Sequence, residues 1–280
     1  MSSEPASGTR PTTNPRRVST ADIVAMKRTG RKIVMLTAYD ALFAALVDGA
    51  GVDMILVGDS VASVLAGEET TLPATLGQMI YHGRSVQRGT TRALVVVDLP
   101  FLSYQISPRD AVRNAGRILK RTGAGAVKLE GGRRYAPTVR ALIDAGIPVM
   151  GHVGFTPQAL HVLGGIRVQG RAEGAAARLE DDALALEAAG AFALVLEFMS
   201  AAVAQRVTER LTIPTIGIGA GPHCDGQVLV LHDMLGLNDG FQAKFVKRYA
   251  QLADAVRGAV ACFADEVRDG RFPDSDHSHR

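Results

Sequence analysis

Tryptophan is absent from this 280-residue chain, and aromatic residues together make up only 5% of it. The apolar interior must therefore be built from Ala, Leu, Val and Ile, in a chain that is 47% hydrophobic with a mean hydropathy of +0.11. Cysteine is also scarce: Cys224 and Cys262 form no CxxC motif and no disulfide framework. We therefore expect a packed protein from a reducing, cytoplasmic compartment.

Long apolar runs and clustered charge are also missing. No uninterrupted apolar run is long enough to span a bilayer, so no membrane partner is expected. The net charge of +3 is spread along the chain, without the basic patch and stacking aromatics of a nucleic-acid interface. Residues 1–18 are rich in Pro, Ser and Thr and lack the apolar segment of a secretory signal. We expect a disordered lead-in there and a loose polar tail over 273–280.

Between these ends, short β-branched runs alternate with longer helical stretches. This alternation predicts a single-domain α/β fold over residues 19–272, a (β/α)8 TIM barrel with a parallel sheet. The eight expected strands are Ile33–Ala38, Met54–Gly58, Ala93–Asp98, Ala126–Leu129, Pro148–His152, Ala193–Leu196, Thr215–Ile218 and Val228–Val230. The expected helices are Ser19–Arg28, Ala41–Ala50, Leu76–Arg88, Pro108–Thr122, Ala136–Ala145, Leu179–Gly190 and Ser200–Leu211.

The chain's last third is harder to interpret. The eighth strand is ambiguous, because QVLVLHDMLG fits helical as well as strand periodicity. Residues 243–270 have a helical pattern, with apolar positions such as Phe245, Val256 and Val260. We expect a helical C-terminal extension there, and its surplus apolar face suggests packing on a neighbouring subunit of a homo-oligomer.

Ionisable side chains follow or end five of the predicted strands. The ends of barrel strands line one mouth, so these side chains are expected to converge there. Several carboxylates with one Lys and one His make a metal-dependent enzyme the leading hypothesis. The residues are Asp59, Asp98, Lys128, Glu130, His152 and Glu197.

The carboxylates carry the metal hypothesis. Asp59 and Asp98 would repel each other at the mouth unless a cation lay between them. Oxygen ligands favour Mg²⁺, which keeps positions open for water or substrate. Either Asp alone is explained as well by capping the helix or turn that follows it. Glu130, a third carboxylate at another strand end, favours the metal.

The other three residues each allow a functional and an ordinary interpretation. Lys128 shares a strand face with Glu130, so it either binds an anionic substrate or forms an internal ion pair. His152 either donates to a substrate oxygen or is an ordinary buried histidine. Glu197 closes the apolar run ALVLE, where a partly desolvated carboxylate suits a general base; alternatively it starts the next helix.

Seven segments in order resemble the ketopantoate hydroxymethyltransferase family: VGDS, VVDLPF, VKLEGG, GHVGFTPQ, GGIRVQGR, LVLE and IGIGAGPHCDGQVLV. The resemblance extends from about Ile33 to the FPDSDHS tail. It implies a barrel related to the phosphoenolpyruvate mutase and isocitrate lyase group. It further implies transfer of a hydroxymethyl group from 5,10-methylenetetrahydrofolate to 3-methyl-2-oxobutanoate, forming 2-dehydropantoate by way of a Mg²⁺-stabilised enolate. A homodecamer is implied as well.

The resemblance also assigns roles to single residues. Asp59, Asp98 and Glu130 match the family's Mg²⁺-site acids, and Glu197 matches its proton acceptor. Its substrate-binding residues are matched by Asp59, Ser60, Asp98, Lys128 and His152.

This sequence departs from the family's pattern at two segments. Ile166 stands in GGIRVQGR where an aromatic residue is usual, and the Glu68–Glu69 segment differs as well. Both differences bear on folate contacts and loop closure. Two rival functions remain: a C–C lyase or phosphonomutase of the same barrel group, which would favour a catalytic Cys, and a non-catalytic scaffold or RNA-binding barrel.

Overall fold

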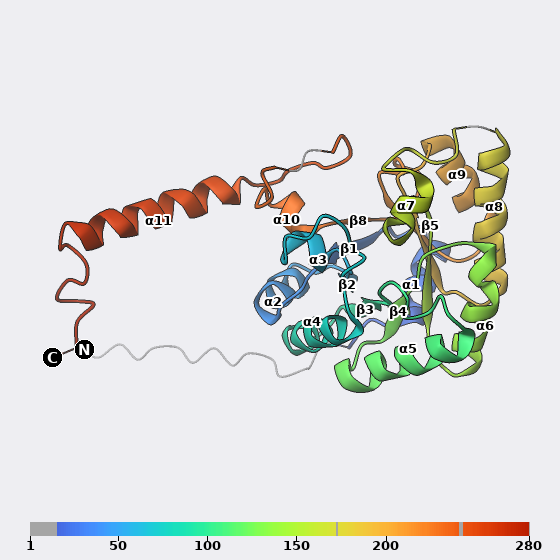
Figure 1. Cartoon of the computed structure of the whole chain (residues 1–280), viewed down its shortest axis with the longest axis horizontal. Coiled ribbons are helices and arrows are strands. Elements are labelled where there is room, and N and C mark those ends of the chain that lie inside the picture. The colour runs from blue at the N-terminus through green and yellow to red at the C-terminus, as the bar shows by residue number, and fades with distance from the viewer. Residues whose placement is uncertain (1–15, 172, 241–242, 280) are drawn as a thin grey trace, which may run out of the picture.

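The computed structural model describes residues 16–171, 173–240 and 243–279. Eight parallel strands follow one another around a closed barrel, in which β1 also pairs with β8 (Figure 1). The predicted (β/α)8 barrel is therefore confirmed. The strands are β1 (Ile33–Thr37), β2 (Met54–Val57), β3 (Leu94–Asp98), β4 (Ala126–Lys128), β5 (Val149–Gly154), β6 (Ala193–Glu197), β7 (Thr215–Ile218) and β8 (Gly226–Leu229).

Helices surround the barrel, and most of the predicted ones are found. The longer helices are α1 (Thr20–Arg28), α2 (Ala41–Gly49), α4 (Leu76–Gly89), α5 (Pro108–Thr122), α6 (Ala136–Asp144), α8 (Glu173–Ala188), α9 (Ala201–Arg210) and α11 (Leu252–Arg268). The short ones, which the sequence did not predict, are α3 (Val61–Val64), α7 (Leu160–Leu163), α10 (Leu231–Met234) and the 3₁₀ turns η1 (Arg133–Tyr135) and η2 (Pro157–Ala159).

Three predicted boundaries were wrong. Strand β8 begins at Gly226, because a residue without a side chain is needed where the carbonyl of Ile33 passes close by. Helix α8 begins at residue 173, because its first turns are rich in alanine, which favours helix without marking an apolar face. Residues 243–251 are not helical: Tyr249 N–H donates to Met234 O at 2.8 Å instead of closing a helical turn.

The barrel is closed at its amino-terminal end. Helix α1 places Ile23 and Met26 against the inward-facing residues of the strands, among them Ile33 and Met54. A second apolar cluster fills the space between the outer face of the sheet and the surrounding helices. The carboxyl end of the barrel is therefore the end that can hold polar groups.

The two-residue repeat of side-chain direction along the strands places ionisable residues at that end. Side chains two apart on a strand point to the same side, and Val96, Ala126, Met150 and Val195 all face the barrel interior. The residues two positions further along these strands therefore face the interior one layer higher. They are Asp98, Lys128, His152 and Glu197.

Helix α11 projects away from the barrel (Figure 1). None of its residues is buried, and about half of the surface of Val256, Val260 and Phe263 is exposed. The predicted helical extension is confirmed over Leu252–Arg268. None of the helices in the described ranges has both the length and the apolarity needed to cross a bilayer.

The two predicted loose ends differ in what the structure describes. Residues 1–15 of the expected lead-in lie outside the described residues. Val18, from the remainder, donates its N–H to Arg92 O at 2.8 Å. Residues 273–279 are solvent-exposed.

We predict that Gly89→Ala lowers the free energy of unfolding by about 1–3 kcal/mol, because a methyl group there would overlap the carbonyl oxygen of Ala41 where α4 meets α2. Urea unfolding at fixed protein concentration measures this. The matched control is Gly116→Ala in α5, where no atom lies within 4 Å of the added methyl. The control should be stabilised by about 0.5–1 kcal/mol through helix propensity. Equal effects in the two variants would contradict the packing explanation.

Candidate active site at the carboxyl end of the barrel

One cavity of about 110 Å³ lies at the mouth of the barrel, and every site residue predicted from the sequence lines it. Most of its other lining residues are apolar, including Leu56, Val195 and Val228, with two threonines, Thr37 and Thr71. A larger cavity of about 620 Å³ lies against Lys32, Val34 and Phe245, but no carboxylate lines it. Chemistry rather than size therefore marks the site. The predicted residues that it unites are Asp59, Ser60, Asp98, Lys128, Glu130, His152 and Glu197.

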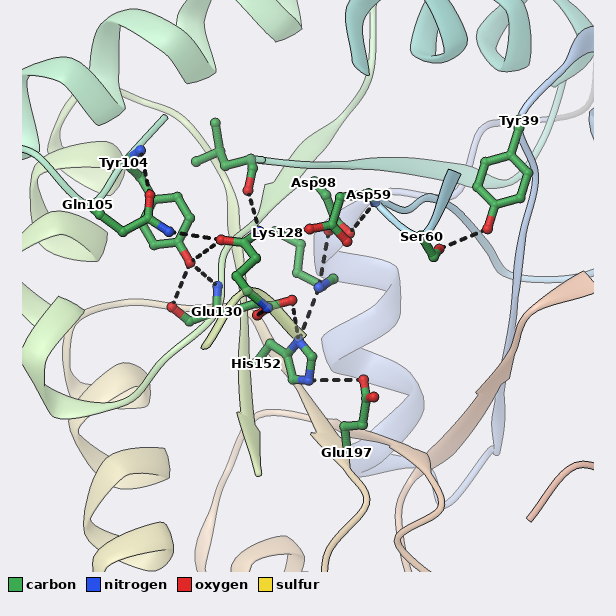
Figure 2. Close-up of polar contacts among 12 residues, drawn as sticks. Tyr39, Asp59, Ser60, Asp98, Tyr104, Gln105, Lys128, Glu130, His152 and Glu197 are labelled. Atoms are coloured by element: carbon green, nitrogen blue, oxygen red, sulfur yellow. Dashed lines mark hydrogen bonds and ion pairs between the residues drawn. The ribbon is translucent and has the colours of Figure 1, made fainter. Parts of the chain in front are cut away.

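The Lys128 ammonium lies at the centre of the polar group (Figure 2). Its Nζ is 3.1 Å from Asp98 Oδ1 and 3.2 Å from His152 Nδ1, and the side chain is only 5% exposed. Burial lowers the pKa of Lys128, but the Asp98, Glu130 and Asp59 carboxylates outweigh it and raise the pKa above its usual value. Lys128 therefore stays charged, and an anion entering the cavity meets a fixed cation.

Asp59 and Asp98 lie side by side at the ends of neighbouring strands. Asp59 N–H donates to Asp98 Oδ2 at 3.1 Å, and both side chains are buried. Burial, followed by repulsion from Asp98 and Glu130, raises the pKa of Asp59 well above its usual value. Burial also raises the pKa of Asp98, although Lys128 opposes it. A cation between the two carboxylates would relieve both effects.

A chain of three ionisable groups extends from β4 to β6. His152 Nδ1 is 3.6 Å from Glu130 Oε1, and its Nε2 is 3.2 Å from Glu197 Oε2 (Figure 2). Burial and Lys128 lower the pKa of His152, but Glu130 and Glu197 outweigh them and raise it to about 9. We therefore assign the imidazolium at neutral pH, in which Lys128 pairs with Asp98 rather than donating to the ring. Glu197 is 21% exposed, the least buried of the group.

Two polar residues missed from the sequence complete the site. Gln158 donates from Nε2 to Asp59 Oδ2 at 2.9 Å, and its backbone N–H donates to Glu130 Oε2 at 3.0 Å. Tyr104 O–H lies 2.9 Å from both Gln158 Oε1 and the Glu130 carbonyl. Gln158 ends the GHVGFTPQ segment, so that motif contained the signal, but nothing in it pointed to Asp59.

Whether these residues fit a metal ion can be tested from their contacts. Asp98 Oδ1 is buried and has no well-directed hydrogen bond from a described residue, although Lys128 Nζ is near. Four carboxylates face two cations in the cavity, so negative charge is in excess. Within the described ranges, no three His, Cys, Asp or Glu side chains are arranged around one point as metal ligands. The site therefore fits an ion held by Asp59 and Asp98, while Glu130 is engaged by His152 and Gln158.

Two other residues considered in the sequence analysis, Cys224 and Ile166, do not line this cavity, whereas Ser60 does. Cys224 is buried in the β7–β8 loop and lines the larger cavity instead. Ser60 lines the site and its Oγ lies 2.8 Å from Tyr39 O–H. Ile166 is 68% exposed on the loop that follows β5.

Comparison with known proteins identifies the family. The model of ketopantoate hydroxymethyltransferase matches residues 17–275. The chain belongs to this family. A 3-methyl-2-oxobutanoate hydroxymethyltransferase from Moorella thermoacetica is 57% identical over 94% of this chain and 98% of its own length. The enzyme of the same name from Syntrophus aciditrophicus is 55% identical over 94% of this chain and 97% of its own.

Solved structures of other proteins share the barrel fold of this member of the ketopantoate hydroxymethyltransferase family. A 2,3-dimethylmalate lyase of the PEP mutase/isocitrate lyase superfamily has a TM-score of 0.60 at 19% identity, covering 94% of this chain and 93% of the other. A phosphonopyruvate hydrolase has a TM-score of 0.62 at 14% identity, with 94% and 92% covered. These likenesses support the fold alone.

We predict that Lys128→Met lowers the free energy of unfolding of the metal-free protein by about 3–5 kcal/mol, because it leaves buried carboxylates without their cation. Urea unfolding in EDTA measures it. The control, Arg113→Met, breaks an exposed pair with Asp110 and should cost at most about 1 kcal/mol. A Lys128 variant as stable as the control would show that Asp98 does not depend on the ammonium.

Proposed function

We propose that this chain transfers a hydroxymethyl group from 5,10-methylenetetrahydrofolate to 3-methyl-2-oxobutanoate, forming 2-dehydropantoate on the route to pantothenate. The observation that carries the proposal is the pairing of a partly exposed carboxylate, Glu197, with a buried cluster around Lys128 in one cavity. Relatives with 55–57% identity along almost the whole chain are named for this reaction. The apolar walls suit the branched carbon end of the oxoacid.

Binding of the oxoacid follows from the charges. Lys128 would attract the negatively charged oxygens of the oxoacid, and Ser60 would donate a hydrogen bond from the neighbouring strand end. His152, held by two carboxylates, would keep its ring fixed beside the reacting carbon. In this arrangement the carboxylate end of the substrate lies by β2 to β4 and its C3 atom by β6.

The oxygens of Asp59 and Asp98 would hold Mg²⁺. When bound, the ion supplies Lewis acidity that withdraws electrons from the oxoacid carbonyl and makes the C3 proton easier to remove. Mg²⁺ is commonly bound by one or two carboxylates, with water or substrate completing its coordination, so two side chains suffice. We propose that Glu130 supports this site through His152 and Gln158 rather than as an equal third ligand.

Glu197 would accept the C3 proton. Its Oε2 faces His152 Nε2, so Oε1 is the oxygen left to take the proton. The His152 ring, 3.2 Å from Oε2, holds this carboxylate in place. The resulting enolate carries negative charge close to Lys128, and its C3 carbon forms the new C–C bond to the methylene carbon of the folate. Both C–N bonds of that carbon break in the overall reaction: one water supplies the hydroxyl oxygen, and the folate nitrogens take up protons to give tetrahydrofolate. The loop after β5, with Gly165 to Arg171, would close over this step and exclude further water.

A homo-oligomer is the proposed state of assembly, and the family resemblance favours a decamer. Helix α11 exposes an apolar stripe that includes Val256, Val260, Phe263 and Val267. Helix α2 also exposes Leu42 and Leu46. Exposed apolar surface of this kind marks protein–protein contacts.

We predict that Asp98→Asn lowers Mg²⁺-dependent turnover about 100-fold or more, because it removes a metal-binding charge while keeping the side chain's shape. The rate is measured against Mg²⁺ concentration, with circular dichroism as the check on folding. Folded Asp98→Asn protein with wild-type activity at limiting Mg²⁺ would contradict the assignment.

We predict that Glu197→Gln slows two reactions together by about 10²–10⁴-fold: C3 deuterium exchange of 3-methyl-2-oxobutanoate, and hydroxymethyl transfer. Both require the same proton removal, while oxoacid binding should persist because Lys128 is intact. Exchange is followed by NMR with and without Mg²⁺. Wild-type exchange in Glu197→Gln would mean that another group is the base.

We predict that light scattering gives a mass several times the 29.5 kDa of one chain. Val260→Glu should lower that mass, because it places a charge in the apolar stripe of α11. Ala261→Glu adds the same charge away from the stripe and serves as the control. A monomeric wild-type protein at micromolar concentration would contradict the proposal.

A further inference from the structure

We propose that Gln158 is a positioning residue that fixes Asp59 and Glu130 in the orientation the divalent cation requires. The inference rests on the proposed function, because it concerns the same metal site. Gln158 lies in η2 on the loop that follows β5, and only 7% of its surface is exposed. Substrate binding and proton transfer do not use it, and the support for Glu130 described above uses only its backbone N–H.

The amide of Gln158 has three of its four hydrogen-bonding positions filled, and a hydroxyl lies within reach of the fourth. Nε2 donates to Asp59 Oδ2 and to the Leu99 carbonyl, both at 2.9 Å. Oε1 accepts from Gln105 Nε2 at 2.8 Å and lies 2.9 Å from Tyr104 O–H, whose one proton is shared with the Glu130 carbonyl. Because the Leu99 carbonyl can only accept, the amide cannot rotate without losing bonds at both ends. The NH₂ group therefore stays directed at Asp59.

This contact gives Asp59 the same arrangement that its neighbour has. In Asp98, Oδ2 accepts from Asp59 N–H at 3.1 Å, and Oδ1 lies 3.1 Å from Lys128 Nζ, without a well-directed hydrogen bond from a described residue. In Asp59, Oδ2 accepts from Gln158 Nε2, and no described donor bonds Oδ1. Each carboxylate thus has one oxygen held by a neutral N–H donor, and its other oxygen can face a metal ion, which at Asp98 is shared with Lys128. The side-chain amide of Gln158 therefore orients Asp59 in the same way that a backbone N–H group orients Asp98.

Gln158 also holds a second carboxylate through its backbone. Its N–H donates to Glu130 Oε2 at 3.0 Å, so one residue holds both Glu130 and Asp59. These carboxylates repel each other, and a neutral donor can hold both without adding charge. A carboxylate at this position would instead add a further negative charge next to Asp59.

The test uses Mn²⁺ as the probe, with free Mn²⁺ measured by electron paramagnetic resonance in the presence of 3-methyl-2-oxobutanoate. Gln158→Leu removes the amide's hydrogen bonds without adding charge, and Gln158→Glu keeps the shape but opposes Asp59 with an acceptor. Loss of such an outer-shell partner typically weakens metal binding about 10–100-fold, and we expect the larger effect in Gln158→Glu. Raising Mg²⁺ should restore much of the turnover of Gln158→Leu.

The matched control is Gln105→Leu, which removes a bond to Gln158 Oε1 but touches neither carboxylate. It should bind Mn²⁺ within about threefold of the wild type, well below the outer-shell effect. Melting temperatures in EDTA separate folding from binding; if Gln158→Leu is unfolded, Gln158→Glu decides the question.

The possible outcomes separate the two proposals. Mn²⁺ binding that is unchanged in both folded Gln158 variants overturns the inference while leaving the proposed function intact. Unfolding of both variants in EDTA also overturns it, because Gln158 would then act on stability. A wild-type protein that binds no Mn²⁺ overturns the proposed function, and the positioning role with it.

Discussion

The ion pair between Lys128 and Asp98 is the constraint on which the site depends. Both side chains are almost completely buried, with 3.1 Å between Nζ and Oδ1. Removing a charge from water costs several kcal/mol, so a carboxylate cluster at this depth needs a cation at its centre. The apolar interior and α1 close the other end of the barrel, which leaves the carboxyl end as the place where such a cluster can form.

The sequence predicted the site because strand periodicity is local. Asp98, Lys128 and Glu197 each stand two residues after an inward-facing apolar residue, so their direction follows from the strand alone. Their convergence follows from barrel closure, which the repeated strand–helix pattern predicts. The fold and the members of the cluster could therefore be predicted together.

Contacts between distant loops could not be predicted in this way. Gln158 meets Asp59 across 99 positions of the sequence, and no periodicity connects η2 with the end of β2. The helix predicted over residues 243–251 was wrong for a related reason, since the apolar pattern of this segment fits a helix while Tyr249 N–H bonds to the Met234 carbonyl of α10. The start of β8 was predicted wrongly because glycine is uncommon inside strands. Gly226 is needed at that position so that the carbonyl of Ile33 can pass close by.

The carboxylates of the site are chemically alike but differ in how deeply they are buried, and this difference suits the different roles proposed for them. Asp59 and Asp98 are buried beside each other, where burial and the neighbouring carboxylates raise the pKa of both, and a bound cation would offset this effect. Glu197 is partly exposed at the opposite side of the barrel, next to His152 rather than to another acid. The proton acceptor proposed here must take and release its proton in every turnover, and the more exposed position of Glu197 is compatible with that role. A lyase and a hydrolase below 20% identical to this chain share the barrel, so the fold alone does not specify the chemistry, and the proposed function depends on the side chains at the mouth.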